Sequence, residues 1–520
     1  MNNLILLKNV VIIPEFFLGI SIIYLFLFGS IVSTYKTYPL IQNLISNLSV
    51  LILSLCTFLI YNDIFLFSEY NLFFEETIVV DYLSFTAKIA IAVSSLICII
   101  MIGHYLKDQK INQFEYFIVI LISILGFFLL CSSNDFITAY LAIELQSLSF
   151  YIMSAFKKNS SFSVEAGLKY FILGSFSSAL FLFGSSIIYG VLGTLNFEDL
   201  KILFNMLEPG SNVILFDMTN LDMEIDLQFS QGAVFDPNLF QFSLVFILTS
   251  LFFKLAVAPM HMWSPDVYEN SPTSSTIFFA VVSKLSILIL LIRIFQYSLH
   301  GFIYTWRYYV VSLAVFSVVV GSITALEQRK LKSLFAYSSV GHIGYILISF
   351  SSGTLEGMQN LYLYIFIYML AGLCIWSIFL ILRLKNIYTK KKNKDLTDFV
   401  LLFKSNPTIA LCFSTVLLSI AGFPPLIGFL TKMGIFLTAI ESTMFFSAII
   451  AILASVIGTF YYIRIIKILY FEKVLVGNLF YPLDYIKTFV IILTFYLFIY
   501  LFINPTFIYL ICYKISVLSL

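Results

Sequence analysis

The sequence contains few charged residues. Only 11% of its 520 residues are Asp, Glu, Lys or Arg, whereas 60% are hydrophobic. Soluble domains carry about 25% charged residues, so this composition excludes an ordinary soluble protein. The net charge of +1 lacks the basic excess that nucleic-acid binding needs. The composition therefore predicts a polytopic membrane protein.

Motifs for metal, redox and nucleophilic chemistry are also missing. The six cysteines all lie in or beside apolar stretches and include no Cys-x-x-Cys pair. The four histidines show no metal-ligand spacing on one helix, and no His-Glu-x-x-His, Gly-rich phosphate loop or nucleophile elbow is found. We therefore expect the cysteines to be buried apolar side chains without disulfides, and we expect this chain to bind no metal.

Long apolar runs dominate what is present. A helix needs about 20 apolar residues to cross the hydrocarbon core, and the sequence contains fourteen such runs. It therefore predicts an all-α fold of about fourteen transmembrane helices. Their predicted limits are 11–33, 41–62, 79–103, 114–131, 135–156, 165–192, 239–258, 272–295, 305–325, 332–351, 359–383, 407–440, 443–470 and 484–512.

The few charges alternate between the two sides of these spans. Connections after odd-numbered spans are basic and include the Lys390–Lys394 cluster, whereas connections after even-numbered spans are acidic and include 193–238. The short connection after span seven, with Asp266 and Glu269, is the exception. The positive-inside rule then predicts that both termini and the acidic segment lie on the outer side.

Two blocks of five spans each contain an interrupted fourth helix. Spans four to eight are interrupted at Pro259, and spans nine to thirteen at Pro424 and Pro425. Because five is odd, a second copy would be inverted, and paired broken helices in inverted repeats indicate an ion site. The predicted organisation is a three-helix segment, a first repeat with the outer loop 193–238, a second repeat with the basic inner loop 384–405, and a C-terminal helix, with limits 1–110, 111–300, 301–475 and 476–520.

Four of the charged residues inside the predicted spans stand out by their sequence context. Lys254 precedes the first break, Lys432 follows the second, and Lys284 and Glu144 lie in uninterrupted apolar runs. A charge at bilayer depth costs about 2.5–3.5 kcal/mol on insertion scales, so such residues are usually functional. Loss of water lowers the pKa of a lysine and a nearby carboxylate raises it again, which suits proton transfer. The alternative is a set of static helix–helix contacts.

Other polar residues lie in less informative sequence motifs. His342 lies within a span among small polar residues, where it could relay protons or serve as a neutral packing residue. Lys88 is interpreted as a structural pair partner and Glu15 as an interfacial residue. Lys169 could also belong to the set of charged residues inside the bundle described above.

The chain is identified as a member of a known family by its motifs. From about residue 75 to 475 it resembles the antiporter-like membrane subunits of respiratory complex I, and it is most similar to their subunit 2 type. The motifs that carry the resemblance are APMHMWSPDVYENSPTSSTIFFAVVSKLS, LKSLFAYSSVGHIGY, AGFPPLIGFLTK, EAGLKYFILGSFSSALFLFG and AIELQSLSFYIM. Two departures are Asn270, where the family has glycine, and the long acidic 193–238 segment.

The resemblance implies a role for each charged residue. Glu144 would modulate Lys254, Lys284 would connect two half-channels, and Lys432 would serve the second half-channel, with His342 as a matching histidine. The fold would bind no cofactor itself, because NADH, FMN, iron–sulfur clusters and ubiquinone belong to other subunits.

The resemblance also implies where the chain works. The expected partners are other membrane-arm subunits on both sides and membrane lipids, in the mitochondrial inner membrane, with both termini facing the intermembrane space. A multisubunit cation/proton antiporter, a non-pumping structural bridge and a chloroplast-type relative remain as alternatives.

Overall fold

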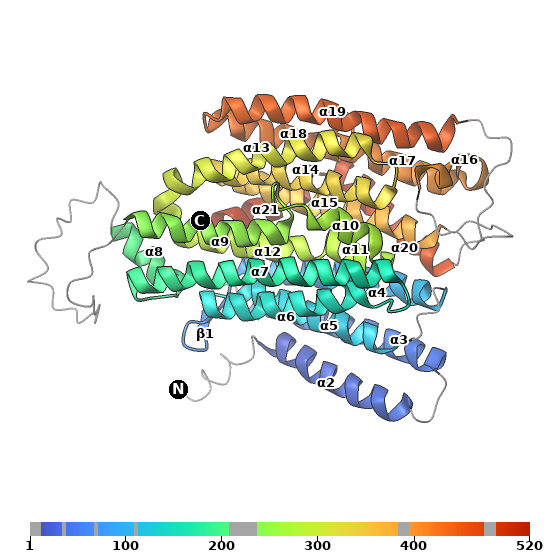
Figure 1. Ribbon diagram of the computed structural model, residues 1–520, viewed down its shortest axis with the longest axis horizontal. Coiled ribbons are helices and arrows are strands. Elements are labelled where there is room, and N and C mark those ends of the chain that lie inside the picture. Colours follow the sequence, from blue (N-terminus) through green and yellow to red (C-terminus); the bar gives the residue numbers. More distant parts are fainter. Residues whose placement is uncertain are drawn as a thin grey trace, which may run out of the picture.

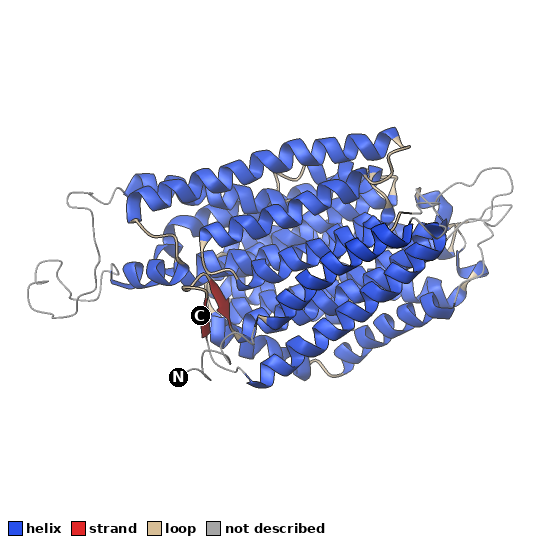
Figure 2. Ribbon diagram, turned by 90° about the horizontal axis from the view of Figure 1, so that it is seen from below, coloured by secondary structure: helices blue, strands red, loops and turns tan. Residues whose placement is uncertain are grey.

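The chain folds into a bundle of long helices that run side by side (Figure 1). The computed structural model describes residues 12–33, 38–66, 71–108, 113–206, 237–382, 395–400, 402–472 and 485–519. Within these ranges the strands form a single short hairpin at one end of the bundle (Figure 2). The all-α class predicted from the sequence is therefore confirmed.

The N-terminal segment forms one flank of the bundle. Its elements are α2 (Ile13–Ser33), α3 (Tyr38–Leu66), β1 (Asn71–Phe73), β2 (Ile78–Val80) and α4 (Tyr82–Asp108). The prediction that the third span begins at residue 79 is wrong, because residues 78–80 pair with β1. The Asp81 carboxylate accepts a bond from the Ser84 N–H at 2.8 Å, and this cap fixes where α4 begins.

The next elements contain the first break. They are α5 (Glu115–Ser132), α6 (Phe136–Ala155), α7 (Ser161–Leu192), α8 (Phe197–Met206), α9 (Pro237–Leu255), α10 (Trp263–Asn270), α11 (Thr273–Val281), α12 (Ser283–Ile292), the π-helix η1 (Arg293–Ser298) and the 3-10 turn η2 (His300–Phe302). The run 272–295, predicted as one helix, is interrupted at Val282 and ends in a π-helix. π-Helical turns are rare and often lie at functional sites.

The remaining elements contain the second break. They are α13 (Ile303–Glu327), α14 (Leu331–Ser352), α15 (Leu355–Ile381), the 3-10 turn η3 (Leu396–Phe399), α16 (Leu402–Ser405), α17 (Pro407–Ala421), α18 (Ile427–Glu441), α19 (Phe445–Tyr470), α20 (Tyr485–Ile503) and α21 (Thr506–Ser519). In Figure 1, α19 lies on the flank opposite α2.

The apolar helices match the predicted membrane spans closely. Twelve described helices are long and apolar enough to cross a membrane, and α20 with α21, bent by 82°, makes a possible thirteenth. The predicted span 407–440 consists of α17 and α18, each fifteen residues long. The central helices α12 and α14 are almost fully buried, whereas α2 and α19 expose apolar side chains, as expected of a bundle core and its lipid- or partner-facing rim.

Two predicted connections fall largely outside the described residues. Helix α8 opens the acidic 193–238 segment, whose residues 207–236 lie outside them. The Lys390–Lys394 cluster also lies outside them, and the described end of that connection forms η3 and α16. The six cysteines are buried and form no disulfides, as predicted.

Candidate proton-transfer site

The first helix break is held by side-chain bonds to the freed backbone. Helix α9 ends at Leu255, Ala256 adopts a φ of 61°, and the peptide bond before Pro259 is cis. The Trp263 indole N–H donates to the Phe253 carbonyl at 2.8 Å. The same carbonyl also accepts from the Ala256 N–H at 3.1 Å, so the two donors satisfy it where the regular helix ladder ends, at a depth where lipid supplies no donor.

Lys254 contacts Glu144 indirectly. Its Nζ lies 3.5 Å from the Tyr151 hydroxyl, and Tyr151 lies one turn along α6 from Ser147. Ser147 Oγ lies 3.3 Å from Glu144 Oε2. The described residues show no ion pair within 4.0 Å between Glu144 and Lys254. A series of hydroxyl groups therefore separates the acid from the base.

This hydroxyl series follows one face of α6. Glu144, Ser147 and Tyr151 are spaced at i, i+3 and i+7, which places them on one helix face. Gly174 on α7 makes room for the tyrosine, because a Cβ added there would lie 2.0 Å from its hydroxyl. Sequence reasoning missed Ser147 and Tyr151, although their helical spacing from Glu144 could have revealed them.

Lys284 is the most isolated of the three lysines. It lies just beyond the interruption at Val282, is 6% exposed, and its Nζ has no hydrogen-bond partner among the described residues. Its Nζ lies 5.4 Å from the centre of the Tyr368 ring. A charge buried without acceptors is costly, so gain or loss of a proton here strongly changes the local energy.

Lys432 bonds to the second helix break. Helix α17 ends at Ala421 and Gly422 adopts a φ of 90°, before the cis Pro424–Pro425 bond. Lys432 Nζ donates to the Ala421 carbonyl at 2.8 Å. A Cβ on Gly422 would lie 2.9 Å from Lys432 Cδ, so glycine is needed both for the backbone and for the lysine. The predicted link between a broken helix and a lysine is direct here.

His342 is the centre of a buried tyrosine cluster. Its Nδ1 lies 2.6 Å from the Tyr364 hydroxyl and its Nε2 lies 2.9 Å from the Tyr462 hydroxyl. The ring of Tyr368, which faces Lys284, lies 5.2 Å from the His342 ring, and Lys432 Nζ lies 5.6 Å from the Tyr345 ring centre. Aromatic groups therefore occupy the space between Lys284 and Lys432.

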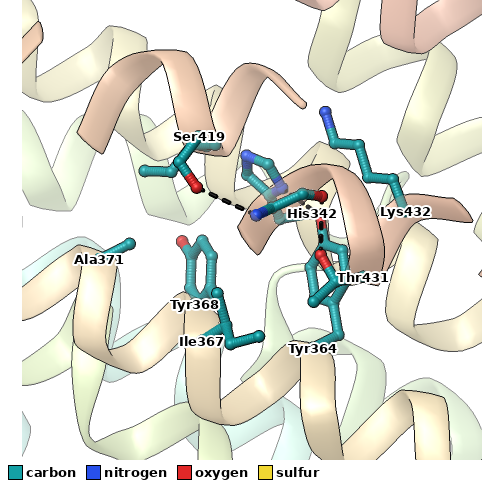
Figure 3. Close-up of a pocket in the computed structure, with 10 residues that line it drawn as sticks. His342, Tyr364, Ile367, Tyr368, Ala371, Ser419, Thr431 and Lys432 are labelled. Atoms are coloured by element: carbon teal, nitrogen blue, oxygen red, sulfur yellow. Dashed lines mark hydrogen bonds between the residues drawn. The ribbon is translucent and has the colours of Figure 1, made fainter. Parts of the chain in front are cut away.

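Two small cavities meet at His342 and Lys432. One is lined by α14, α15, α17 and α18, and Figure 3 shows Tyr364, Tyr368 and Thr431 around it. The other is lined by α13, α14, α18 and α19. The space open to the centre of a water molecule is about 20 Å³ in the first and about 10 Å³ in the second, enough for about one water in each. Both side chains therefore line space inside the bundle that is about the size of a water molecule.

The structure groups the predicted residues into two sets. Glu144 and Lys254 form the first set, while Lys284, His342 and Lys432 form the second through the tyrosines. None of the contacts between described residues joins Lys254 to Lys284, so the connection that the resemblance implies for Lys284 has no direct bond. The tyrosines were missed because they are far from the lysines in sequence.

The peripheral charges also find partners. Lys88 Nζ lies 2.6 Å from Glu15 Oε1, and both side chains are buried. The prediction of Lys88 as a pair partner is confirmed, and its partner Glu15, which is predicted to be interfacial, lies near the start of α2. Lys169 pairs with Glu165 and Asp266 in an exposed position, away from the buried axis.

Comparisons with known proteins agree with this architecture. The family described as NADH:quinone oxidoreductase/Mrp antiporter, TM, matches residues 133–458. NADH-ubiquinone oxidoreductase chain 2 of Marchantia polymorpha is 37% identical over 508 residues, covering 97% of each chain. NADH-quinone oxidoreductase subunit N of Pelagibacter ubique is 37% identical over 463 residues, covering 89% of each.

A solved structure shares the fold. A chain of respiratory complex I from Thermus thermophilus aligns with a TM-score of 0.75 and 23% identity, covering 95% of this chain and 98% of that one. The broken helices, the buried lysines and these similarities lead to one conclusion. The chain belongs to the NADH:quinone oxidoreductase/Mrp antiporter membrane family, among the relatives of chain 2 and subunit N.

Proposed function

We propose that this chain is a core membrane-arm subunit of mitochondrial respiratory complex I that moves protons across the inner membrane. Electron transfer from NADH to ubiquinone would take place in other subunits, which hold FMN and the iron–sulfur clusters. Changes in conformation and charge along the bundle would couple that reaction to Glu144, Lys254, Lys284, His342 and Lys432.

One observation carries this proposal: the three lysines, of which Lys284 and Lys432 are buried and Lys254 is partly buried, form no static ion pair among the described residues. Lys432 bonds to a freed carbonyl, Lys254 meets a tyrosine hydroxyl, and Lys284 has no acceptor among the described residues. A buried ion pair would hold its proton firmly. Neutral partners instead leave the amines free to exchange protons with hydroxyl groups and water.

The partners and the membrane follow from the relatives. The plant relative is a subunit of NADH-ubiquinone oxidoreductase, which supports partners in a membrane arm on both flanks of this bundle. The exposed apolar side chains of α2 and α19 suit neighbouring subunits and lipids. By the positive-inside rule, both termini face the intermembrane space.

The first experiment replaces Lys254 with methionine in the assembled complex. We expect Lys254→Met to lower the ratio of protons moved to electrons transferred, measured in sealed vesicles supplied with NADH and a quinone. Methionine keeps the apolar stem and removes the amine. The matched control is Lys158→Met, which removes an exposed lysine from a short connection and should leave the ratio unchanged.

Two outcomes would favour the other functions. An unchanged ratio in Lys254→Met would indicate a non-pumping structural bridge. A pH change that depends on Na⁺ and needs no NADH would indicate a cation/proton antiporter, the other activity in the family description.

A further inference from the structure

A second group of buried charges lies far from the lysine axis, in the N-terminal segment. Glu15 on α2 and Lys88 on α4 form an ion pair of 2.6 Å whose side chains are 7% and 4% exposed. Asp63, near the end of α3, is 6% exposed. All three precede the residues 133–458 that match the family, so the repeats do not account for this group.

Asp63 interacts electrostatically with both members of the pair. Its helix, α3, packs against both α2 and α4, so Glu15 repels its charge and Lys88 attracts it. Its Oδ2 is buried and has no hydrogen-bond partner among the described residues. Lys88 is the base that acts on Asp63, and it is already in contact with Glu15. The group thus contains two carboxyls and one ammonium.

The neighbouring charges balance each other. Arg293 in η1 pairs with Asp81 at 2.7 Å and also donates from Nε to the Cys131 carbonyl at 3.0 Å. Arg293 is therefore the cation that pairs with Asp81. If Glu15, Asp63 and Lys88 were all ionised, the buried group would carry one uncompensated negative charge, which a dry interior strongly disfavours.

We propose that Glu15, Asp63 and Lys88 form a second buried proton-binding site, in which Lys88 pairs with Glu15 and Asp63 holds one exchangeable proton. Such a site takes up or releases a proton without separating the Glu15–Lys88 pair. The ion pair and the acid therefore have different roles. The pair links α2 to α4, and Asp63 exchanges a proton with its surroundings.

The position of the group gives it a short route to water. Glu15 lies near the start of α2, Asp63 near the end of α3 and Lys88 near the start of α4. These three helix ends lie at the end of the bundle that carries the β1–β2 hairpin and α8 (Figure 1). The exchange would thus occur near one membrane surface and not at mid-membrane.

Several other groups share this environment. Cys56 on α3 interacts electrostatically with Glu15. Cys131 on α5 interacts electrostatically with four charged residues, Lys88, Arg293, Asp81 and Glu15. Among these, Asp63 is the acid without a dedicated cation, so the proton is assigned to it.

A carboxyl-specific reagent tests the proposal directly. Dicyclohexylcarbodiimide enters membranes and reacts with protonated carboxyls, and peptide mass spectrometry then locates the modified residue. We expect label on Asp63 and none on Glu15 when the assembled complex is treated near neutral pH. Labelling of Asp63 should fall by about tenfold for each pH unit above its midpoint.

Variants separate the two carboxyls. In Lys88→Met, Glu15 loses its cation and should become labelled, whereas Lys88→Arg keeps the pair and should preserve the original pattern. Asp63→Asn should remove the label from position 63 and leave Glu15 unlabelled. If the complex that carries Lys88→Met fails to assemble, the labelling pattern of Glu15 and Asp63 in the unaltered chain still tests the proposal.

Three results would overturn the proposal. They are absence of label on Asp63 at every pH from acid to alkaline, equal labelling of Glu15 and Asp63 in the unaltered chain, and suppression of the Asp63 label when Na⁺ replaces choline. The last result would identify a bound cation in place of the proton. None of them bears on Lys254, so this test is independent of the proposed pumping function.

Discussion

At both helix breaks a side chain donates a hydrogen bond to a backbone carbonyl at the end of the helix, but the two side chains differ. At the first break, Trp263 donates to the freed carbonyl and Lys254 points to a tyrosine hydroxyl that leads to an acid. At the second, Lys432 itself donates to the freed carbonyl, with no acid in contact among the described residues. One lysine therefore lies near a carboxylate across intervening hydroxyl groups, and the other bonds to a backbone carbonyl.

This difference indicates what can change the charge of each lysine. Movement of Glu144 or of the Ser147–Tyr151 series would change the environment of Lys254 without moving the break. Any change at Lys432 would instead alter its bond to Ala421 and the two cavities beside it. The first set suits a response to electrostatic change, and the second suits a response to movement of α17 against α18.

The largest effect is expected at Lys432, because it joins the break to the cavities. We predict that Lys432→Met lowers coupled NADH oxidation at least about tenfold, equivalent to about 1.4 kcal/mol in activation free energy. Lys432→Arg should recover part of the activity. The exposed Lys404 supplies the control, and activity of Lys432→Met equal to that of Lys404→Met would refute the assigned role.

A slightly smaller effect is expected at the tyrosine cluster. His342→Phe keeps the ring volume and removes both bonds to Tyr364 and Tyr462, so it should reduce proton translocation several-fold. Tyr364→Phe and Tyr462→Phe each remove one of those bonds and should show smaller losses. If the relay is only a packing contact, all three variants will translocate protons normally.

Gly422 should show an effect on stability as well as on activity. Gly422→Ala places a Cβ at a φ of 90° and 2.9 Å from Lys432 Cδ. The left-handed backbone alone costs about 1–2 kcal/mol for a non-glycine residue, so we predict a lower thermal unfolding temperature and weaker proton translocation. Gly190→Ala is the matched control, since nothing lies within 4 Å of its added Cβ.

The smallest effect is expected at Tyr151. Its hydroxyl lies 3.5 Å from Lys254 Nζ, a long contact, and a water molecule can replace it. Tyr151→Phe should therefore slow proton transfer by about twofold to threefold, less than one kcal/mol in barrier. The comparison is with Phe171→Leu, at the exposed edge of the same aromatic group. A loss as large as that of Lys254→Met would show that the hydroxyl is indispensable.

The sequence predicts the framework of this site better than its connections. Hydropathy and proline identify the spans and both breaks, and an isolated lysine in an apolar run, such as Lys284, is visible without a structure. The interruption at Val282 and the π-helix at Arg293–Ser298 contain no proline or glycine, so packing rather than local preference creates them. No local pattern reveals them.

Contacts between residues far apart in the sequence could not be predicted from the sequence either. His342 meets Tyr462, which is 120 residues away, and Glu15 on α2 meets Lys88 on α4 with α3, β1 and β2 between them in the sequence. The Glu144, Ser147 and Tyr151 spacing was visible in the sequence but gained meaning only when Lys254 was placed beside Tyr151. Contacts across helices require the bundle, and single-sequence periodicity carries no information about them.

Lys284 provides the most direct test of the proposed function, in which the two sets of residues act together to move protons. The measurement is the ratio of protons moved to electrons transferred in vesicles that contain the Lys284→Met complex. We predict a ratio as low as those of Lys254→Met and Lys432→Met, because losing the middle base interrupts the path. An unchanged ratio, with the complex fully assembled, would contradict it.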